Sequence, residues 1–432
     1  MKKNNLPFLK DNSYVSKIEW DDLTRYPKDY NYYRKYVGQK ISILEHNEIA
    51  FAKNPDGSVD FSKKINFDDL ILDLKNIGIK LSDRDFVRLL NGESIDRIES
   101  LSIFYNQLKN TPWDGVDRIN DLVSAANLEG EYDTNFYLIK KWLCTTYAFA
   151  LRDIDSSTPD TVYSRVVFIL CSEKRGIGKT VFFRRLGMSG EIAKTIGVLG
   201  AEIYAESPGE IPKDDRNFAI DRSTKILYLF DDINELVIKQ EGTLRSYISQ
   251  DIFTHRALYK DSNQSLKRTA TFAGTTNYSN LLKNNSENRY MMFTVKDIMD
   301  FDRLNGIKYI QLWAQIREEI IAEKEKVFFN SEDLEMIRKM SDDYIYISPL
   351  EQVLNNMFVY DENGKIGFSE VMKSLKEEYS ISASMNNVGA KLKLLAPEGV
   401  DIIHKKNGKR YYKLQWRNLV DEGEGDDQDL PF

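Results

Sequence analysis

Residues 171–180 have the residue types that bind phosphate groups. They follow residues 166–170, an apolar segment typical of a buried parallel strand, and precede residues 181–186, which read as a helix. In such a loop glycines let the backbone close around phosphate oxygens, a lysine reaches the β- and γ-phosphates, and a threonine hydroxyl binds Mg²⁺. The sequence therefore predicts a phosphate-binding loop for ATP and Mg²⁺, formed by Gly176, Gly178, Lys179 and Thr180.

Carboxylates end a second apolar segment about 50 residues further along the chain. Residues 226–230 read as a strand, Asp231 and Asp232 follow directly, and Glu235 lies in the next turn. A carboxylate at such a strand end can bind Mg²⁺, and its neighbour can polarise the attacking water. We expect Asp231 to bind the metal with Thr180. The residue that activates water stays open among Asp231, Asp232 and Glu235.

Two further polar residues mark the ends of strand-like segments. Asn277 follows residues 270–276, and its amide is suited to a hydrogen bond with the attacking water or the γ-phosphate. Arg289 precedes residues 290–295. It is a candidate arginine finger that acts across a subunit boundary, a device that accelerates phosphoryl transfer by about 10³–10⁵. A surface arginine without that role is the alternative.

Residues 254–268 read as two strand-like arms around a polar tip, the pattern of a β-hairpin. Basic side chains on such a hairpin suit the gripping of DNA phosphates. The candidate DNA contacts here are Lys260, Lys267 and Arg268.

Together these motifs resemble superfamily 3 helicases of the AAA+ class, and within them the virulence-associated protein E family of phages and mobile genetic elements. The resemblance covers about residues 110–300. It implies a homo-hexameric ring with ATP between subunits, Arg289 at the neighbour's nucleotide, and Lys260 on a channel hairpin that moves single-stranded DNA. The matching segments are residues 113–119 (Trp-Asp-Gly-Val-Asp-Arg-Ile), 176–180, 231–236, 256–260, 274–277 and 288–289.

The elements that position these residues indicate a multidomain α/β protein. Alternating strand and helix patterns from about residue 164 to 295 are the signature of an α/β core. We expect a small α+β N-terminal domain (1–105), a helical collar (106–155), an AAA+ ATPase domain (156–335), a winged helix (347–417) and an acidic, disordered tail (418–432).

The predicted winged helix carries a basic surface. Three helix-like segments precede two strands around an Asn-Gly turn, a strong hairpin signal. Basic residues on its third helix and wing are expected to meet DNA phosphates, with protein contacts as the alternative. They are Lys391, Lys393, Lys405, Lys406, Lys409 and Arg410.

The last residues resemble the C-terminal tip of bacterial single-stranded DNA-binding proteins. Residues 421–429 carry six acids and no base and would act as an acidic tether; the predicted binding tip is Asp429, Leu430, Pro431 and Phe432, with Phe432 as the apolar anchor. The resemblance implies that this tip binds host replication proteins. The alternative is a tail that only adds solubility.

Composition fits an intracellular protein. The chain has 432 residues, 42% of them hydrophobic, and a net charge of −7. It has no apolar run long enough to cross a membrane. Its two cysteines, Cys144 and Cys171, lie in apolar surroundings and are expected to be buried thiols, and its three histidines are too scattered for a zinc site. We expect a cytoplasmic location and no membrane partner.

Two functions remain open at this point. The first is an ATP-dependent DNA helicase or translocase that acts on single-stranded and forked DNA, including an origin, during replication of a mobile element. The alternative is a nucleotide-switched regulatory ATPase that assembles on DNA without unwinding it. Glu173, which stands where the phosphate-binding pattern usually begins with glycine, would favour the second if it blocked the phosphate pocket.

Overall fold

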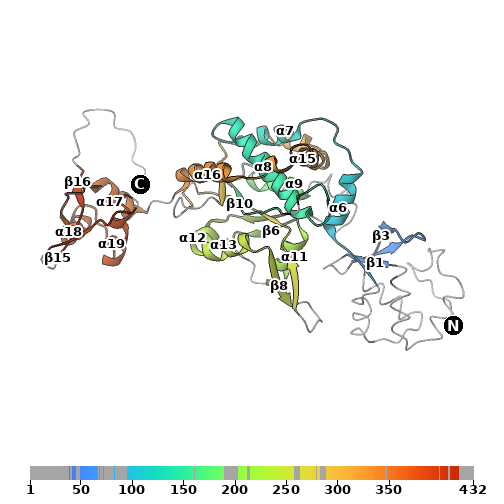
Figure 1. Cartoon of the computed structure of the whole chain (residues 1–432), viewed down its shortest axis with the longest axis horizontal. Coiled ribbons are helices and arrows are strands. Elements are labelled where there is room, and N and C mark those ends of the chain that lie inside the picture. The colour runs from blue at the N-terminus through green and yellow to red at the C-terminus, as the bar shows by residue number, and fades with distance from the viewer. Residues whose placement is uncertain are drawn as a thin grey trace. The chain divides into compact units, whose positions relative to one another are not determined.

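The structure is a computed structural model. The chain forms two compact units, Met1–Ile345 and Tyr346–Phe432, and Figure 1 gives the element labels used below. The structure describes residues 41–44, 49–66, 95–159, 161–188, 203–211, 215–256, 263–278, 280–282, 289–345, 348–397, 399–406 and 409–417, with single positions 38, 68, 72 and 82.

Five strands form the central sheet of the first unit. They are β5 (Val167–Cys171), β6 (Tyr204–Pro208), β7 (Leu227–Asp231), β10 (Thr271–Thr276) and β11 (Tyr290–Thr294). Their order across the sheet is β11-β5-β10-β7-β6, and every neighbouring pair is parallel. Parallel strands share one carboxyl edge, where α/β proteins bind ligands. Strand β10 lies between the strand of the predicted phosphate-binding loop and the strand of the predicted carboxylates.

Helices cover both faces of this sheet. Along β5 the side chains of Phe168 and Leu170 enter one hydrophobic core, and those of Val167 and Ile169 enter the other, as the two-residue period of a strand requires. The first core is shared with α6 (Ser100–Lys109), α7 (Arg118–Ala125), α8 (Tyr132–Leu151), α9 (Lys179–Met188), α14 (Phe301–Gly306), α15 (Tyr309–Glu323) and α16 (Ser331–Met340). The second is shared with α11 (Asp215–Thr224), α12 (Asn234–Lys239) and α13 (Glu241–Ser249).

Helices α7 and α8 lie within residues 106–155, the region expected to form a helical collar. Helix α8 is apolar over most of its circumference, and its Trp142 packs edge-on against Phe168 of β5 and Phe183 of α9. The indole of Trp313 on the neighbouring α15 donates a hydrogen bond of 2.8 Å to the Leu186 carbonyl. The region predicted as a helical collar therefore shares one core with the sheet.

Four short strands precede these helices. They are β1 (Ile41–Leu44), β2 (Ile49–Lys53), β3 (Val59–Asn66) and β4 (Asp96–Ile98), in the order β3-β2-β1-β4. The turn between β2 and β3 closes with a hydrogen bond of 2.9 Å from the Gly57 amide to the Asn54 carbonyl, and Gly57 adopts the positive φ that this turn demands. Much of the N-terminal domain expected over residues 1–105 lies outside the described residues.

A two-stranded hairpin follows α13. Strands β8 (Ile252–Arg256) and β9 (Asn263–Lys267) pair antiparallel, with His255 opposite Gln264. The hairpin predicted over residues 254–268 is thereby confirmed, and its tip, which carries Lys260, lies outside the described residues. No helix in the described part of the chain is both long and apolar enough to cross a membrane.

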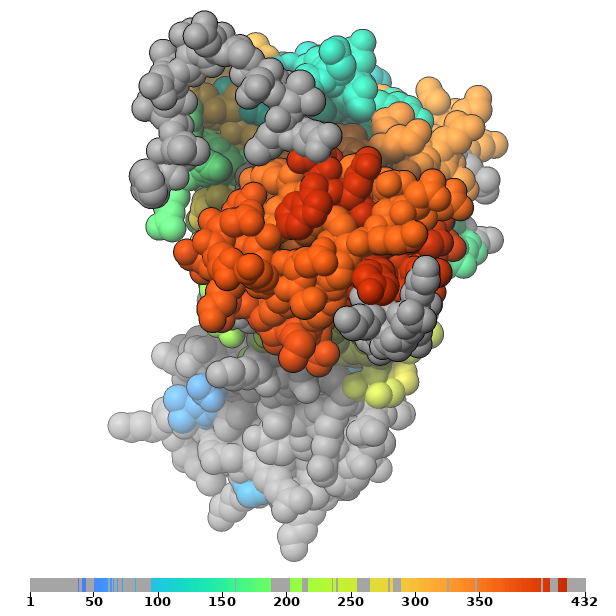
Figure 2. Space-filling view, turned by 90° about the vertical axis from the view of Figure 1, so that its left-hand side faces the viewer, coloured from blue at the N-terminus to red at the C-terminus, as the bar shows by residue number. Residues whose placement is uncertain are grey.

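The second unit has its own core, which includes Leu354, Val371, Val388 and Leu414. In the space-filling view its atoms, coloured orange to red, form a continuous body (Figure 2). Its helices are α17 (Pro349–Met357), α18 (Phe368–Glu377) and α19 (Met385–Lys393). Its strands are β12 (Phe358–Tyr360), β13 (Ile366–Gly367), β14 (Ile403–Lys406), β15 (Lys409–Tyr412) and β16 (Leu414–Trp416), paired as β13-β15-β14 and β12-β16.

Candidate functional site

The loop between β5 and α9 has backbone geometry that requires its glycines. Gly176 and Gly178 have φ angles of 72° and 111°, a region that other residues rarely adopt. A Cβ atom on Gly178 would also lie 3.1 Å from the side chains of Met299 and Phe301. The loop is thus pressed against the segment before α14, and its glycines let the backbone lie close to whatever it binds.

Lys179 is buried at the base of this loop, with 7% of its surface exposed. Its ammonium group donates hydrogen bonds of 3.0 Å to the carbonyls of Ser172 and Lys174 and to Oδ1 of Asn277. Burial lowers the pKa of Lys179, and the charges of Asp231 and Asp232 oppose that effect. The structure therefore holds a desolvated cation at the carboxyl edge of the sheet, suited to an anionic ligand.

Asp231 ends β7 at the same edge. Its Oδ1 accepts hydrogen bonds of 2.8 Å from the Thr180 hydroxyl and 2.6 Å from the Thr275 hydroxyl. The hydroxyl and the carboxylate are hard oxygen donors, which fit Mg²⁺ when phosphate oxygens and water complete the shell. In the described part of the chain no cluster of three or more acids, histidines or cysteines could bind a metal without such help.

Asp232 adopts a left-handed backbone conformation with a φ of 61°. Non-glycine residues in this region cluster at functional sites. The Asp232 amide donates a hydrogen bond of 3.0 Å to the Thr275 hydroxyl, and its carboxylate accepts one from the Asn234 side chain. The Oδ1 atom of Asn234 in turn accepts a hydrogen bond from the Thr276 hydroxyl.

Sequence reasoning missed Thr275, Thr276 and Asn234. Each lies within two positions of a residue that the patterns did identify, in the runs Gly-Thr-Thr-Asn and Asp-Asp-Ile-Asn. Two hydroxyls at the end of a fully buried strand were a usable signal, because buried hydroxyls need hydrogen-bond partners. The side chain of Glu235, the third candidate acid, lies outside the described residues.

Arg289 lies at the opposite edge of the sheet. Its carbonyl accepts a hydrogen bond of 2.7 Å from the amide of Val167, the first residue of β5, whereas the phosphate-binding loop follows the last residue of that strand. Its guanidinium donates a hydrogen bond of 3.0 Å to the Ser249 hydroxyl. Strand β5 therefore separates Arg289 from the phosphate-binding loop of its own chain.

The two basic residues at the end of the hairpin differ sharply in environment. Lys267 is exposed and pairs with Asp153 at 2.9 Å. Arg268 is fully buried and donates hydrogen bonds to the carbonyls of Ser164, Ile248, Gln250 and Ala270.

Its guanidinium also stacks on Phe149 and Phe272, and burial lowers the pKa of Arg268 to about 10. The prediction of Arg268 as a DNA contact is therefore wrong, because its donors anchor the base of the hairpin to the sheet.

The predicted DNA contacts of the second unit lie on α19 and on strands β14 and β15. Lys391 forms an ion pair of 2.5 Å with Glu351 of α17, and Lys393 is exposed. The side chains of the remaining four, and the whole of residues 418–432 with the predicted partner-binding tip, lie outside the described part of the chain. The four are Lys405, Lys406, Lys409 and Arg410.

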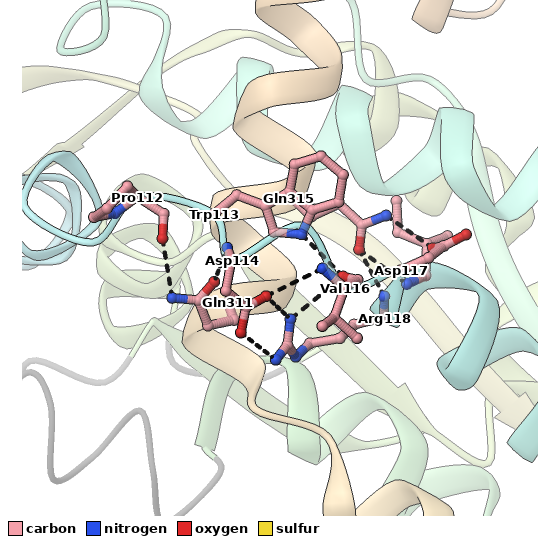
Figure 3. Close-up of polar contacts among 9 residues, drawn as sticks. Pro112, Trp113, Asp114, Val116, Asp117, Arg118, Gln311 and Gln315 are labelled. Atoms are coloured by element: carbon pink, nitrogen blue, oxygen red, sulfur yellow. Dashed lines mark hydrogen bonds and ion pairs between the residues drawn. The ribbon is translucent and has the colours of Figure 1, made fainter.

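The run Trp-Asp-Gly-Val-Asp-Arg-Ile has a structural role (Figure 3). The Arg118 guanidinium binds both carboxylate oxygens of Asp114, at 2.6 and 2.7 Å, and holds the pKa of Asp114 at about 2. Oδ1 of Asp117 caps α7.

Two glutamines of α15 bind the same segment. Oε1 of Gln311 accepts from the Asp114 amide at 2.9 Å, and Oε1 of Gln315 accepts from the Arg118 amide at 2.8 Å. These contacts fix the start of α7 on α15. Gln311 and Gln315 are four positions apart, so the helix period places both side chains on the same face of α15.

The loop after Asn277 is tied to the end of the first unit. The amides of Leu281 and Leu282 both donate hydrogen bonds of 2.9 Å to the Tyr344 carbonyl. The Tyr344 hydroxyl lies 3.1 Å from the hydroxyl of Thr294 at the end of β11. The carboxyl edge of the sheet is thus connected to the segment that leads into the second unit.

The fold and the site define an α/β protein with a P-loop-like core. Residues 108–346 match the virulence-associated protein E-like domain, and the chain belongs to that family. The family resemblance seen in the motifs is thereby confirmed.

Comparison with one solved structure agrees at the level of fold. The apo structure of the NrS-1 C-terminal region (305–718) is similar with a TM-score of 0.50 at 12% identity, covering 90% of this chain and 100% of that one. A structure described as SCCmec type IV Cch, active helicase, has a TM-score of 0.35 at 11% identity, covering 87% of this chain and 92% of that one. No curated protein matches the sequence.

Proposed function

We propose that this protein is an ATP-dependent DNA helicase or translocase of the superfamily 3, AAA+ type. The observation that carries the proposal is that four polar residues meet at one edge of the sheet. Lys179 donates a hydrogen bond of 3.0 Å to Asn277, and Thr180 donates one of 2.8 Å to Asp231. A buried cation, an oxygen pair suited to Mg²⁺ and a polar amide are the parts that phosphoryl transfer from ATP needs.

In the proposed reaction the oxygen of a water molecule attacks the γ-phosphorus of ATP. The bond from that phosphorus to the β–γ bridging oxygen breaks, so that ADP and inorganic phosphate form. Asp232 accepts the proton of the water, and Asn277 and Lys179 orient the γ-phosphate. Mg²⁺, held by Thr180 and Asp231, would offset the charge on the phosphate oxygens.

Arg289 supports a site shared between subunits. It lies across the sheet from the phosphate-binding loop of its own chain, hydrogen-bonded through its backbone to Val167. A finger in that position can serve a nucleotide only on a neighbouring subunit, and a ring of identical subunits supplies one at every interface. We therefore propose a homo-hexamer with Arg289 acting in trans.

DNA binding is assigned to the hairpin and the second unit. Lys267 is exposed on β9, and Lys260 belongs to the hairpin tip, so the hairpin is proposed to grip one strand.

The order α17, β13, α18, α19 and the pair β14–β15 supports a winged helix. Exposed Lys393 and the basic residues of β14 and β15 would contact phosphates, and the tip from Asp429 to Phe432 would bind host replication proteins.

A forked-duplex assay tests the proposal. Purified protein with ATP and Mg²⁺ is expected to separate the strands and to hydrolyse ATP faster when DNA is present, and Lys179→Ala is expected to lose both activities. ATP-dependent DNA binding without strand separation would replace the helicase by the regulatory ATPase. Absence of ATP binding would overturn both functions.

A further inference from the structure

We infer that Thr276 and Asn234 are positioning residues for ATP hydrolysis, which aim the Asp232 carboxylate and couple it to the loop of Asn277. The inference rests on the proposed ATPase function and adds two residues that would touch neither nucleotide nor metal. It starts from a chain of hydrogen bonds across the two neighbouring strands β10 and β7.

The Thr276 hydroxyl is the first link of this chain. It lies at the end of β10 and is fully buried. It accepts a hydrogen bond of 3.0 Å from the Tyr278 amide and donates one to Oδ1 of Asn234. The hydroxyl has one proton to donate, and of its two acceptors Oδ1 of Asn234 is much closer than the Tyr278 carbonyl, which lies 3.4 Å away.

The amide of Asn234 is the second link. Because its Oδ1 accepts the Thr276 proton, its Nδ2 must face the other way, and there it donates to Oδ1 of Asp232. Only 8% of Asn234 is exposed, so water competes little for these hydrogen bonds. The Thr276 hydroxyl therefore selects the amide orientation that holds the carboxylate.

The backbone under Asp232 is fixed independently. The amide of Asp232 donates to the Thr275 hydroxyl at 3.0 Å, and the amide of Ile233 donates to the Thr275 carbonyl at 2.8 Å. Gly274 makes room for this turn, because a Cβ atom there would lie 2.9 Å from Ile233. With the left-handed turn pinned in this way, the side chain of Asp232 is the part that remains free to be aimed.

This chain of hydrogen bonds links Asn277 and Asp232, two of the residues that the proposed reaction needs around the γ-phosphate. Oδ1 of Asn277 accepts a hydrogen bond from the Lys179 ammonium group. The amide of the next residue, Tyr278, donates a hydrogen bond to the Thr276 hydroxyl. A ligand that displaces Asn277 from Lys179 would move this turn. The hydrogen bonds of Thr276 and Asn234 would then carry the movement to the Asp232 carboxylate. Loss of the chain should therefore reduce turnover and leave nucleotide affinity unchanged.

Thr276→Val and Asn234→Ala test the inference, with Thr276→Ser as the conservative variant. Valine keeps the shape of threonine and removes the hydroxyl. The expected result is a kcat at least about tenfold lower with the Kd for a fluorescent ATP analogue within about twofold. Thr276→Ser should restore most of the kcat, because serine keeps the hydroxyl.

Thr271→Val is the matched control. Thr271 lies at the other end of β10, is equally buried, and pairs its hydroxyl with Ser164 at 2.9 Å. An equal loss of kcat in this variant would mean that any buried hydroxyl of β10 supports activity, and would overturn the inference.

A double-mutant cycle separates this inference from the proposed function. In an Asp232→Asn background, Thr276→Val should reduce kcat no further, because the group that it aims is already lost. Additive losses, or a wild-type kcat in both Thr276→Val and Asn234→Ala, would reject the inference while the ATPase stands. A wild-type protein without ATP hydrolysis would instead remove the proposed function itself.

Discussion

The Thr180 hydroxyl donates a hydrogen bond of 2.8 Å to Asp231, across 51 positions of the sequence. Thr180 lies in the first turn of α9 and Asp231 ends β7, and β10 lies between β5 and β7. Thr275 of β10 donates to the same carboxylate oxygen at 2.6 Å. The pair is therefore held in place from the intervening strand, which makes the proposed metal site rigid before any ligand binds.

Thr180→Ala and Asp231→Asn should each raise the Mg²⁺ concentration needed for half-maximal ATP hydrolysis by about tenfold or more, because each removes a proposed oxygen ligand. Titration of ATPase activity with Mg²⁺ measures this shift. Glu332→Gln, a change of an exposed acid on α16, is the control and should leave the Mg²⁺ dependence alone. An unchanged Mg²⁺ curve in both site variants would refute the metal assignment.

Lys179→Ala should reduce ATP hydrolysis by about 100-fold or more, because no other described cation is placed among the Ser172, Lys174 and Asn277 oxygens. Steady-state ATPase assays with and without DNA measure the loss. Lys373→Ala removes an exposed lysine of α18 and should behave as wild type. Retention of full activity by Lys179→Ala would disprove the site.

Arg289→Ala should bind ATP normally and lose hydrolysis by about 10³-fold. The sharper test mixes it with Lys179→Ala subunits. A mixed interface can combine an intact phosphate-binding loop from one subunit with an intact Arg289 from the other, so random mixing should restore about a quarter of wild-type activity. If the mixture stays as inactive as its parts, Arg289 does not act in trans.

Arg268→Ala should lower the free energy of unfolding by about 3 kcal/mol or more, because four carbonyls and two aromatic faces lose a buried partner. Arg268→Lys should rescue little, since one ammonium cannot replace the planar fork. Lys267→Ala breaks only an exposed pair and should change stability by less than about 1 kcal/mol. Thermal unfolding compares the three, and equal stabilities would contradict the anchoring role.

Gln315→Leu should destabilise the protein by about 2 kcal/mol, because the buried amides of Arg118 and Ile119 both lose their acceptor. Gln311→Leu, whose partner amide on Asp114 lies at the surface, should cost about half of that or less. Chemical denaturation of both variants provides the comparison. A larger effect at Gln311 would contradict the ranking by burial.

Local patterns were enough to predict the residues that meet at the sheet edge. Lys179, Asp231 and Asn277 each follow an apolar strand, and parallel strands bring their carboxyl ends together whatever their order. The order itself decides which neighbours support them. The roles of Thr275 and Thr276 depend on β10 lying beside β7, and no short-range pattern encodes that pairing.

The error at Arg268 has a related cause. Lys267 and Arg268 look alike as a basic pair, and a hairpin end makes exposure the ordinary expectation. The arginine is instead drawn inward by carbonyls from residues 164, 248, 250 and 270, and the first three lie 18 or more positions away in the sequence. These four carbonyls come together only in the folded protein, so no local pattern reveals them.

The double hydrogen bond at the Tyr344 carbonyl has a mechanical consequence. The amides of residues 281 and 282 both donate to the single carbonyl oxygen of Tyr344, so these residues are held to the end of the first unit at two points. A displacement of residues 281 and 282 would therefore pull directly on residues 344 and 345, the last residues of the first unit.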